Sequence, residues 1–420
     1  MHRKHWRPSL AVLAMVGLLA CSGIVSAVDF QLTGFGTLGY SRSFERDLTY
    51  LRYIDHGGTL KVDSLIGVQA EAQFNPQWGA TVQAVASAPR TRDDGYEAKV
   101  RWAFLSFRPD NDWLIRLGRV RPPMFINTQN AEVGVTYDSA RLPAEVYTLS
   151  PVYDVDGAAV TKTWSLPSTE LNLDGYWGKA DVKYRNHYQL DPPATYFPER
   201  ITAKGLVLSH ASGPVLLRAG IHHAELEATG SEQFPRAYAP TDIPGSPPSG
   251  GTLYLPTGTM SKTDIRVLTM GIDWRSEPWR VTAEYAKRKA PDTDLLVNDQ
   301  SAYLTVARRL NAWTPYVTYA RILSKPETRQ IYRDVYDTPV PLAVQGAPFF
   351  VPENYHRLLG NFPVFDQYSI MLGTSYSFSP TSKLKFEWMH TKVGLVSSLV
   401  DGEAQDRSFN VLSVSYSLAF

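Results

Sequence analysis

The end of this chain limits its fold more than any other segment. Residues 408–420 alternate strictly, with Leu412, Val414, Tyr416, Leu418 and Phe420 on one face and small or polar residues on the other. A period of two indicates a β-strand with two different faces. Chain termini usually fray, so a hydrophobic strand that continues to the last residue needs a partner. A membrane barrel supplies one, because its last strand pairs with its first.

The N-terminal residues have the pattern of a secretory leader. Arg3, Lys4 and Arg7 precede the apolar core 9–19, and Val25-Ser26-Ala27 offers a small-residue cleavage site. We therefore predict a signal peptide over 1–27 and a single barrel domain over 28–420. A membrane-anchoring helix would need about 20 apolar residues. The alternative is a lipoprotein signal, in which Leu18-Leu19-Ala20-Cys21 directs lipidation of Cys21.

Composition excludes several classes of function. Cys21 is the only cysteine, so cysteine nucleophiles and cysteine-based zinc sites are excluded from the mature chain. The 42 Lys and Arg nearly balance the 41 Asp and Glu, which does not indicate nucleic-acid binding. We find neither a phosphate-binding glycine loop nor a Gly-x-Ser-x-Gly elbow. The sequence therefore predicts no cofactor, no metal and no catalytic residue.

Seven short turns, each flanked by alternating segments, predict seven hairpins. With one strand at each end of the chain, the total is sixteen strands. We expect an all-β fold, a transmembrane antiparallel up-and-down β-barrel, with its termini and short turns on one side. The predicted strands are 29–41, 59–74, 78–88, 96–108, 112–119, 154–165, 169–178, 201–210, 214–225, 263–275, 279–289, 301–309, 313–323, 367–379, 383–393 and 408–420.

Tryptophan placement distinguishes a membrane barrel from a soluble sandwich. Six of the ten tryptophans lie at the short-turn ends of predicted strands. A sandwich would bury its aromatics centrally, whereas a membrane wall gathers them at headgroup level. The predicted aromatic girdle comprises Trp78, Trp113, Trp164, Trp274, Trp279, Trp313 and Phe420.

Strand parity and three long connections suggest what the interior contains. The connections are 120–153, 226–262 and 324–366, and loops of this length are usually functional or disordered. Parity predicts inward-facing cations at Lys61, Lys99, Arg101, Arg116, Arg218, Arg280 and Lys385. It predicts inward-facing acids at Asp63, Glu71, Asp174, Glu284 and Glu387. The 120–153 loop carries Arg121, Glu132, Asp138, Arg141 and Glu145.

At this point the chain resembles the sixteen-stranded porin superfamily of Gram-negative outer membranes. The resemblance covers the mature chain through strand count, turn asymmetry and the terminal Phe420, and Phe35-Gly36-Thr37-Leu38-Gly39-Tyr40 is similar to the opening strand of many porins. It implies that the 120–153 loop folds into the lumen, where its acids oppose a basic wall. It also implies a homotrimer, contact with membrane lipid and lipopolysaccharide, and recognition of the C-terminal strand by the barrel-assembly machinery.

The leading functional hypothesis is an outer-membrane porin. Small hydrophilic solutes and ions would diffuse passively through a water-filled channel, which sixteen strands are wide enough to leave. Two alternatives belong to other classes. A soluble or lipid-anchored all-β binding protein would show the same strand alternation, and an outer-membrane hydrolase would need catalytic groups that the sequence does not reveal.

Overall fold

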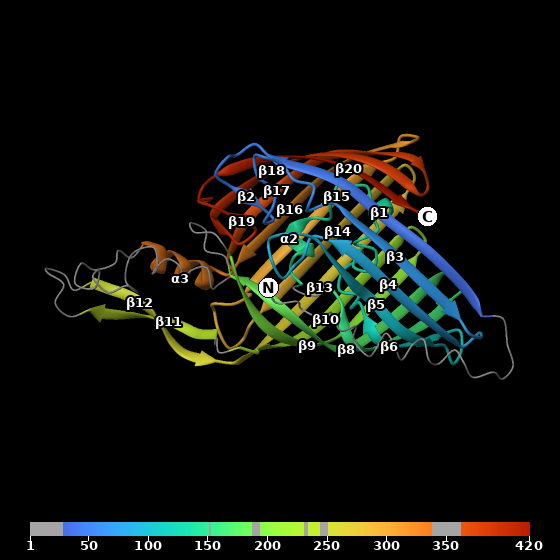
Figure 1. The fold of residues 1–420 in the computed structure, drawn as a ribbon, viewed down its shortest axis with the longest axis horizontal. Helices are drawn as coiled ribbons and strands as arrows, with labels where there is room; N and C mark the ends of the chain where they lie inside the picture. The colour runs from blue at the N-terminus through green and yellow to red at the C-terminus, as the bar shows by residue number, and fades with distance from the viewer. Residues whose placement is uncertain (1–27, 151–152, 187–193, 231–233, 244–250, 338–362) are drawn as a thin grey trace, which may run out of the picture.

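The computed structural model describes residues 28–150, 153–186, 194–230, 234–243, 251–337 and 363–420. The predicted leader 1–27 and Cys21 lie outside these residues. Sixteen strands close into one antiparallel barrel, which confirms the predicted fold class (Figure 1). Its strands are β1 (Asp29–Ser43), β3 (Leu65–Gln73), β4 (Trp78–Ser87), β5 (Glu97–Phe107), β6 (Trp113–Val120), β7 (Val155–Leu166), β8 (Thr169–Asn186), β9 (Thr195–Ser212), β10 (Val215–Ala228), β13 (Lys262–Ser276), β14 (Trp279–Lys289), β15 (Asp299–Arg308), β16 (Trp313–Ser324), β17 (Phe365–Ser379), β18 (Ser382–Ser397) and β20 (Ser408–Ala419).

The barrel closes where its first strand meets its last. Phe35 lies opposite Ala419, and Ser43 lies opposite Val411. At the seam the amide of Gly34 donates to the carbonyl of Phe420 over 2.7 Å, and the amide of Phe420 donates to the carbonyl of Gly34 over 2.8 Å. The terminal strand is therefore paired to its last residue, as its alternation predicts.

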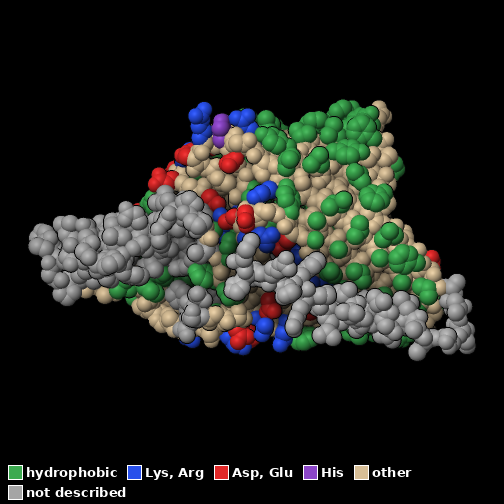
Figure 2. Space-filling model, in the orientation of Figure 1, with side chains coloured by type: hydrophobic (Ala, Val, Ile, Leu, Met, Phe, Trp, Pro, Cys, Tyr) green, Lys and Arg blue, Asp and Glu red, His purple; other side chains and the backbone are tan. Residues whose placement is uncertain are grey.

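The two faces of the terminal strand lie on opposite sides of the barrel wall, as predicted. Leu412, Val414 and Tyr416 are exposed on the outer wall, whereas Ser413, Ser415 and Ser417 are buried on the inner face. The same outer wall carries exposed aromatics at the short-turn ends of the strands. Trp78, Trp113, Trp164, Trp279, Trp313 and Phe420 are exposed, and Trp274 is half-buried. Figure 2 shows hydrophobic side chains spread over one part of the wall, where few charged side chains occur.

The elements outside the closed wall lie in the connections between its strands. They are β2 (Thr49–Tyr50), the 3-10 turn η2 (Gly134–Thr136), α2 (Ala144–Tyr147), β11 (Phe234–Ile243), β12 (Gly251–Met260), α3 (Pro326–Asp337) and β19 (Val400–Asp401). β11 pairs with β12, and β2 pairs with β19. In Figure 1 the β11–β12 hairpin and α3 extend beyond one end of the barrel. Among the described residues, no helix has both the length and the apolar character needed to cross a membrane.

Several sequence predictions need correction. The strands predicted over 169–178 and 201–210 are longer, since β8 is Thr169–Asn186 and β9 is Thr195–Ser212. The second barrel strand begins at Leu65 rather than at residue 59, so Lys61 and Asp63 precede the strand instead of belonging to it. Only a single bridge, between Ser41 and Thr59, joins the expected strand start to β1. The connection expected over 226–262 begins only after β10 ends at Ala228, and it contains the β11–β12 hairpin. These two strands pair with each other and add nothing to the closed wall.

Candidate functional site: the barrel interior

The connection between β6 and β7, described over 121–150 and 153–154, makes many polar contacts with the barrel wall, and we call it the β6–β7 segment. This segment contains η2 and α2. Its polar side chains and carbonyl groups meet inward-facing residues from several strands. Most of these contacts fall into four groups, and two further wall residues contact the segment outside them.

The first group is an ion-pair cluster next to β5. Arg101 Nε lies 2.9 Å from one carboxylate oxygen of Glu132, and Arg121 Nη2 lies 2.7 Å from the other. Arg121 Nε also lies 2.9 Å from Asp154. Burial raises the pKa of Glu132, but the charges of Arg121 and Arg101 outweigh it and hold that pKa below its usual value. The sequence brings Arg101 to this position through a register shift opposite Gln83 and Ala84.

The second group joins the segment to the closing seam. Arg141 makes two hydrogen bonds to Asp63, of 3.0 and 2.7 Å, and its Nη2 also donates to Ser413 over 2.8 Å. Ser41 donates to the same carboxylate over 2.6 Å. Burial opposes the charged form of Asp63, yet Arg141 and Ser41 lower its pKa overall. Because bidentate arginine–carboxylate pairs fix geometry strongly, this contact fixes the segment beside β1 and β20.

The third group lies on β17 and β18. Lys383 Nζ and Ser375 Oγ each donate to Asp138 over 2.8 Å. Lys385 is fully buried and donates to the carbonyls of Gly134 and Ser139, over 2.6 and 3.0 Å. Burial opposes ionisation of Asp138, but Lys383 lowers its pKa below the usual value. Two lysines of one strand thus bind a single turn of the segment.

The fourth group surrounds α2 and the start of the segment. Glu284 of β14 accepts hydrogen bonds from Tyr147, Tyr303 and the amide of Ile126, over 2.6, 2.7 and 2.6 Å. Glu145 is fully buried, where Gln367 donates to it over 2.9 Å and Ser369 also donates to it.

Two further wall residues contact the segment. Arg218 donates to the carbonyl of Phe125 over 2.7 Å. Tyr316, which accepts from the amide of Ala140 over 3.3 Å, donates to Glu387 over 2.7 Å. Around these contacts lies an apolar cluster that includes Phe125, Val146 and Tyr147.

Among the described residues, several other predicted side chains make their polar contacts away from the segment. Lys61 donates to the carbonyl of Asp93 over 3.3 Å, and Lys99 pairs with Glu97 at 3.1 Å. Arg280 pairs with its wall neighbour Asp273 at 2.9 Å. Glu71 accepts from Gln69 over 2.5 Å.

The wall from β3 to β4 and from β6 to β8 has inner polar residues that bind one another. Gln83 donates to Gln69 over 2.6 Å. Thr161 donates to Asp174 over 2.5 Å, and Arg116 donates to Thr161 over 3.4 Å. This stretch of wall therefore differs from the β14–β20 side, where the inner side chains are bound to the β6–β7 segment.

Sequence reasoning missed several residues that hold the segment. Lys383, Asp154, Ser41 and the tyrosines at 147, 303 and 316 were not singled out. Lys383 lies two residues before Lys385 on the same strand, so the two side chains face inward together. Tyr303 shares the inward face with Glu284 on the neighbouring strand. Either relation could have identified these residues from the sequence. Within the part of the chain that the structure describes, no group of three His, Cys, Asp or Glu side chains is placed to hold a metal ion.

Comparisons with known proteins support the fold. No family model matches the chain, and no curated protein matches its sequence. Solved structures do match. OmpTdeltaL8, a loop-deletion mutant of an outer-membrane protein of Vibrio cholerae, has a TM-score of 0.53 at 11% identity, over 94% of this chain and all of that one. The outer-membrane channel DcaP of Acinetobacter baumannii has a TM-score of 0.52 at 12% identity, covering 95% and 100%. OmpF of Salmonella typhi has a TM-score of 0.50 at 10% identity, covering 93% and 97%. The chain therefore has the closed sixteen-stranded barrel fold of outer-membrane porins.

Proposed function

We propose that the protein is a porin of the bacterial outer membrane, through which small hydrophilic solutes and ions diffuse passively. One observation carries this proposal. A closed barrel exposes Leu, Val and aromatic side chains outward and keeps Ser, Lys and Glu side chains inward. Such a wall is stable when hydrocarbon surrounds it and water fills its interior. The proposal involves no catalytic step, no cofactor and no energy source.

We further propose that the β6–β7 segment narrows this channel. Its contacts with β5, β10, β14, β18 and β20 all involve inward-facing side chains. The free aqueous path would then run along the wall of β3, β4 and β6–β8, past the half-buried Arg116 and Asp174. Charges that face each other across such a passage filter solutes by charge and dipole. Arg116 on this stretch and Lys99 on the adjacent β5 are cations that could act on a passing ion.

Single-channel recording in planar bilayers tests the proposal. We expect the purified protein to produce stepwise conductance increases, and a salt gradient to give a reversal potential that reports ion selectivity. Carbonate extraction should leave the protein in the membrane fraction. Release by carbonate together with an absence of conductance steps would favour the soluble or lipid-anchored binding protein. Turnover of lipid or peptide substrates by the purified protein would favour the hydrolase.

We propose two partners together with this function, on the basis of the resemblance to porins. The chain would assemble as a homotrimer, and the terminal β20 with Phe420 would be recognised by the barrel-assembly machinery. Cross-linking in intact membranes would establish the number of subunits. Recovery of the monomer alone would overturn the trimer without affecting the channel.

A further inference from the structure

An ion pair joins opposite sides of the barrel at its long-loop end, which we call the barrel mouth. Arg185, near the end of β8, makes two hydrogen bonds to Asp401 of β19, of 3.1 and 2.8 Å. β19 lies in the connection between β18 and β20. In the closed sheet six strands separate β8 from β20 in one direction, and seven separate it from β18 in the other. Figure 1 shows β18 and β20 at the top of the barrel and β8 and β9 at the bottom. The contact therefore spans the mouth.

Asp93, in the connection between β4 and β5, joins this ion pair to two more parts of the mouth. Its carboxylate accepts hydrogen bonds from Arg52 Nε and Arg185 Nε, each over 3.1 Å, and from the Tyr196 hydroxyl over 2.6 Å. Arg52 lies in the connection between β1 and β3, and Tyr196 lies at the start of β9. Burial opposes ionisation of Asp93, but Tyr196 and Arg185 lower its pKa overall. We call Arg52, Asp93, Arg185, Tyr196 and Asp401 the mouth bridge.

A strained turn holds Arg52 in the mouth bridge. Leu51 and Arg52 have φ values of 48° and 72°, in the left-handed region that residues other than glycine rarely adopt. The amide of Leu51 donates to the carbonyl of Leu399 over 2.9 Å, which helps to hold this conformation. From the turn, Arg52 donates to the carbonyls of Pro89 and Arg92 over 3.0 and 2.9 Å. Such strained positions cluster at functional sites, and this one directs Arg52 toward the β4–β5 connection.

Apolar packing fixes the other side of the mouth. Tyr50, Ile54 and Val400, in and beside the small β2–β19 sheet, are fully buried. They belong to one apolar cluster with Phe125 and Tyr147 of the β6–β7 segment and with side chains of β14 to β18. The β2–β19 sheet is therefore anchored over that side of the barrel. The mouth bridge crosses the remaining side, above the wall along which we place the aqueous path.

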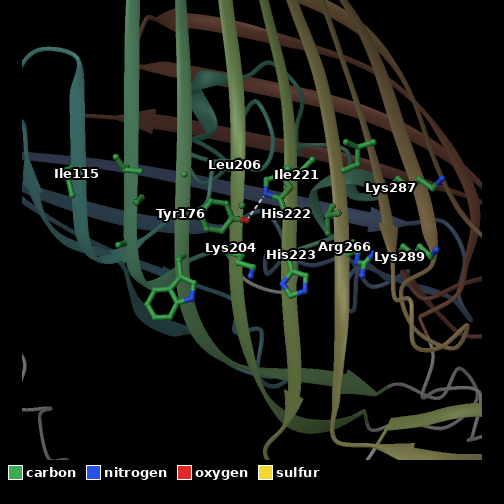
Figure 3. A pocket seen from close by; sticks show the side chains of 18 residues that line it. Ile115, Tyr176, Lys204, Leu206, Ile221, His222, His223, Arg266, Lys287 and Lys289 are labelled. Atoms are coloured by element: carbon green, nitrogen blue, oxygen red, sulfur yellow. Dashed lines mark hydrogen bonds between the residues drawn. The ribbon is translucent and has the colours of Figure 1, made fainter.

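The wall that carries Arg185 is itself held together on its inner face. The Tyr176 hydroxyl of β8 lies 2.9 Å from His222 Nδ1 of β10, and His222 Nε2 lies 3.1 Å from the Thr269 hydroxyl of β13. Figure 3 shows the contact between Tyr176 and His222, which reaches across β9. Gly205 of β9 permits it, because a Cβ atom there would lie 2.6 Å from His222 Nδ1. Opening of the mouth therefore involves the connections rather than this wall.

The mouth bridge is weaker than the contacts around it. Its four charged side chains have between 15% and 33% of their area exposed, whereas the buried pair of Arg121 and Glu132 has only 1% and 8%. Ion pairs that solvent reaches contribute little to stability and are screened by salt. Opening the apolar cluster would instead expose many side chains to water. The bridge is thus the part of the mouth that can open while the rest of the molecule stays folded.

We propose that the mouth bridge is a gate over the aqueous path. Arg185 bound to Asp93 and Asp401 closes the entrance, and separation of Arg185 from these two acids admits solutes. The inference rests on the proposed channel function and adds a device that regulates entry. Because the gate is ionic and partly exposed, it opens more often as the ionic strength rises.

Single-channel recording at two salt concentrations tests the gate. The Debye length falls from about 10 Å at 0.1 M to about 3 Å at 1 M, so the fraction of time that the wild type spends closed should fall severalfold between them. Arg185→Gln and Asp401→Asn should each lower the closed fraction at 0.1 M about threefold and remove its salt dependence. The double variant should add little, because both changes break the same contact. Arg407→Gln is the matched control and should close like the wild type, since Arg407 pairs with Asp47 between neighbouring connections.

Cross-linking tests the gate without relying on lost charge. Residues 28–420 contain no natural cysteine, so Arg185→Cys with Asp401→Cys can be joined by a short bifunctional thiol reagent with a cleavable disulfide spacer. We expect the joined protein to lose most of its current and to regain it on reduction. The pair Asp47→Cys with Arg407→Cys is the control, and its cross-link should leave the current unchanged.

Two results would overturn the gate. One is a closed fraction in Arg185→Gln equal to that of the wild type at 0.1 M salt, and the other is full current through the protein cross-linked at 185 and 401. Conductance steps would persist in either case, so the proposed channel would stand. Absence of conductance from every protein, the wild type included, would overturn the channel and the gate together.

Discussion

At the scale of single residues, Glu132 joins the β6–β7 segment to β5 through Arg101. Its carboxylate binds two arginines that are themselves buried, so Glu132→Gln leaves Arg101 and Arg121 with Asp154 as their remaining acid. Removing one partner of a buried ion pair costs about 3–5 kcal/mol. We expect a higher and noisier single-channel conductance. Glu277→Gln is the control, because Glu277 pairs with Arg309 in an exposed turn, and unchanged traces for both variants would refute the anchoring role.

The carboxylates of the segment also predict how the channel responds to acid. Arginine and lysine partners hold the pKa values of Asp63, Glu132 and Asp138 below their usual values. An acid with a lowered pKa in the folded state stabilises it above the unfolded pKa, and this stabilisation disappears as the pH falls through the folded pKa. We expect constant conductance from pH 7 to about 4.5 and an increase below about pH 4. The Asp63→Asn, Glu132→Gln, Asp138→Asn variant should already show the increase at pH 7, and an acid transition of the same size in that variant would contradict this account.

Residues on the free side of the interior are expected to set selectivity. Lys99 is half-exposed and pairs with Glu97 at 3.1 Å, so its ammonium group remains partly available to ions. Lys99→Glu should shift the reversal potential toward cations, by roughly twofold in permeability ratio, because a screened charge in water acts weakly. Lys162→Glu, at the outer wall near Trp113 and Trp164, is a control that should not shift it. An unchanged reversal potential for Lys99→Glu would remove this residue from the basic wall.

At the scale of elements, residue alternation predicted well where the barrel strands lie. It predicted poorly which residues the inward-facing side chains contact. Strand existence follows from local period two, so β14 was predicted at its observed bounds. The start of β3 was misplaced because residues 59–64 continue the alternation while Asp63 turns to bind Arg141. That partner is 78 positions away, and Glu145 meets Ser369 across 224 positions. Alternation within a short stretch of sequence gives no information on such distant pairs. It did identify most of the charged residues that form them.

The contacts of the β6–β7 segment also predict the effect of removing its middle part. Deleting 132–145 eliminates the contacts to Arg101, Asp63, Lys383 and Lys385 together. If the segment narrows the lumen, single-channel conductance should rise roughly twofold. Replacing the β11–β12 hairpin with a short Gly-Ser linker is the control, since that hairpin lies outside the closed sheet. Equal conductance after the 132–145 deletion would place the segment outside the conducting path.

At the scale of the whole molecule, the barrel depends on one seam between segments from opposite ends of the chain. β1 and β20 pair over nine residue positions from Phe35–Ala419 to Ser43–Val411. A barrel has no free edge only when this seam forms. The ring of Phe420 lies over Gly34, where a Cβ atom would come within 2.4 Å of it, so the terminal aromatic covers a position that only glycine fills without displacing that ring.

This arrangement predicts a specific role for the last residue. Phe420 is 71% exposed and contributes little buried area, so Phe420→Ala should change the stability of the finished barrel only slightly. We expect instead a severalfold smaller amount of folded protein in the membrane, because the side chain marks the strand that must find β1. Heat-dependent electrophoretic mobility separates folded from unfolded barrel and measures both quantities. Phe378→Ala removes another exposed aromatic of the outer wall and should assemble normally. If the two variants assemble equally well, Phe420 is simply one more interface aromatic and the seam closes without it.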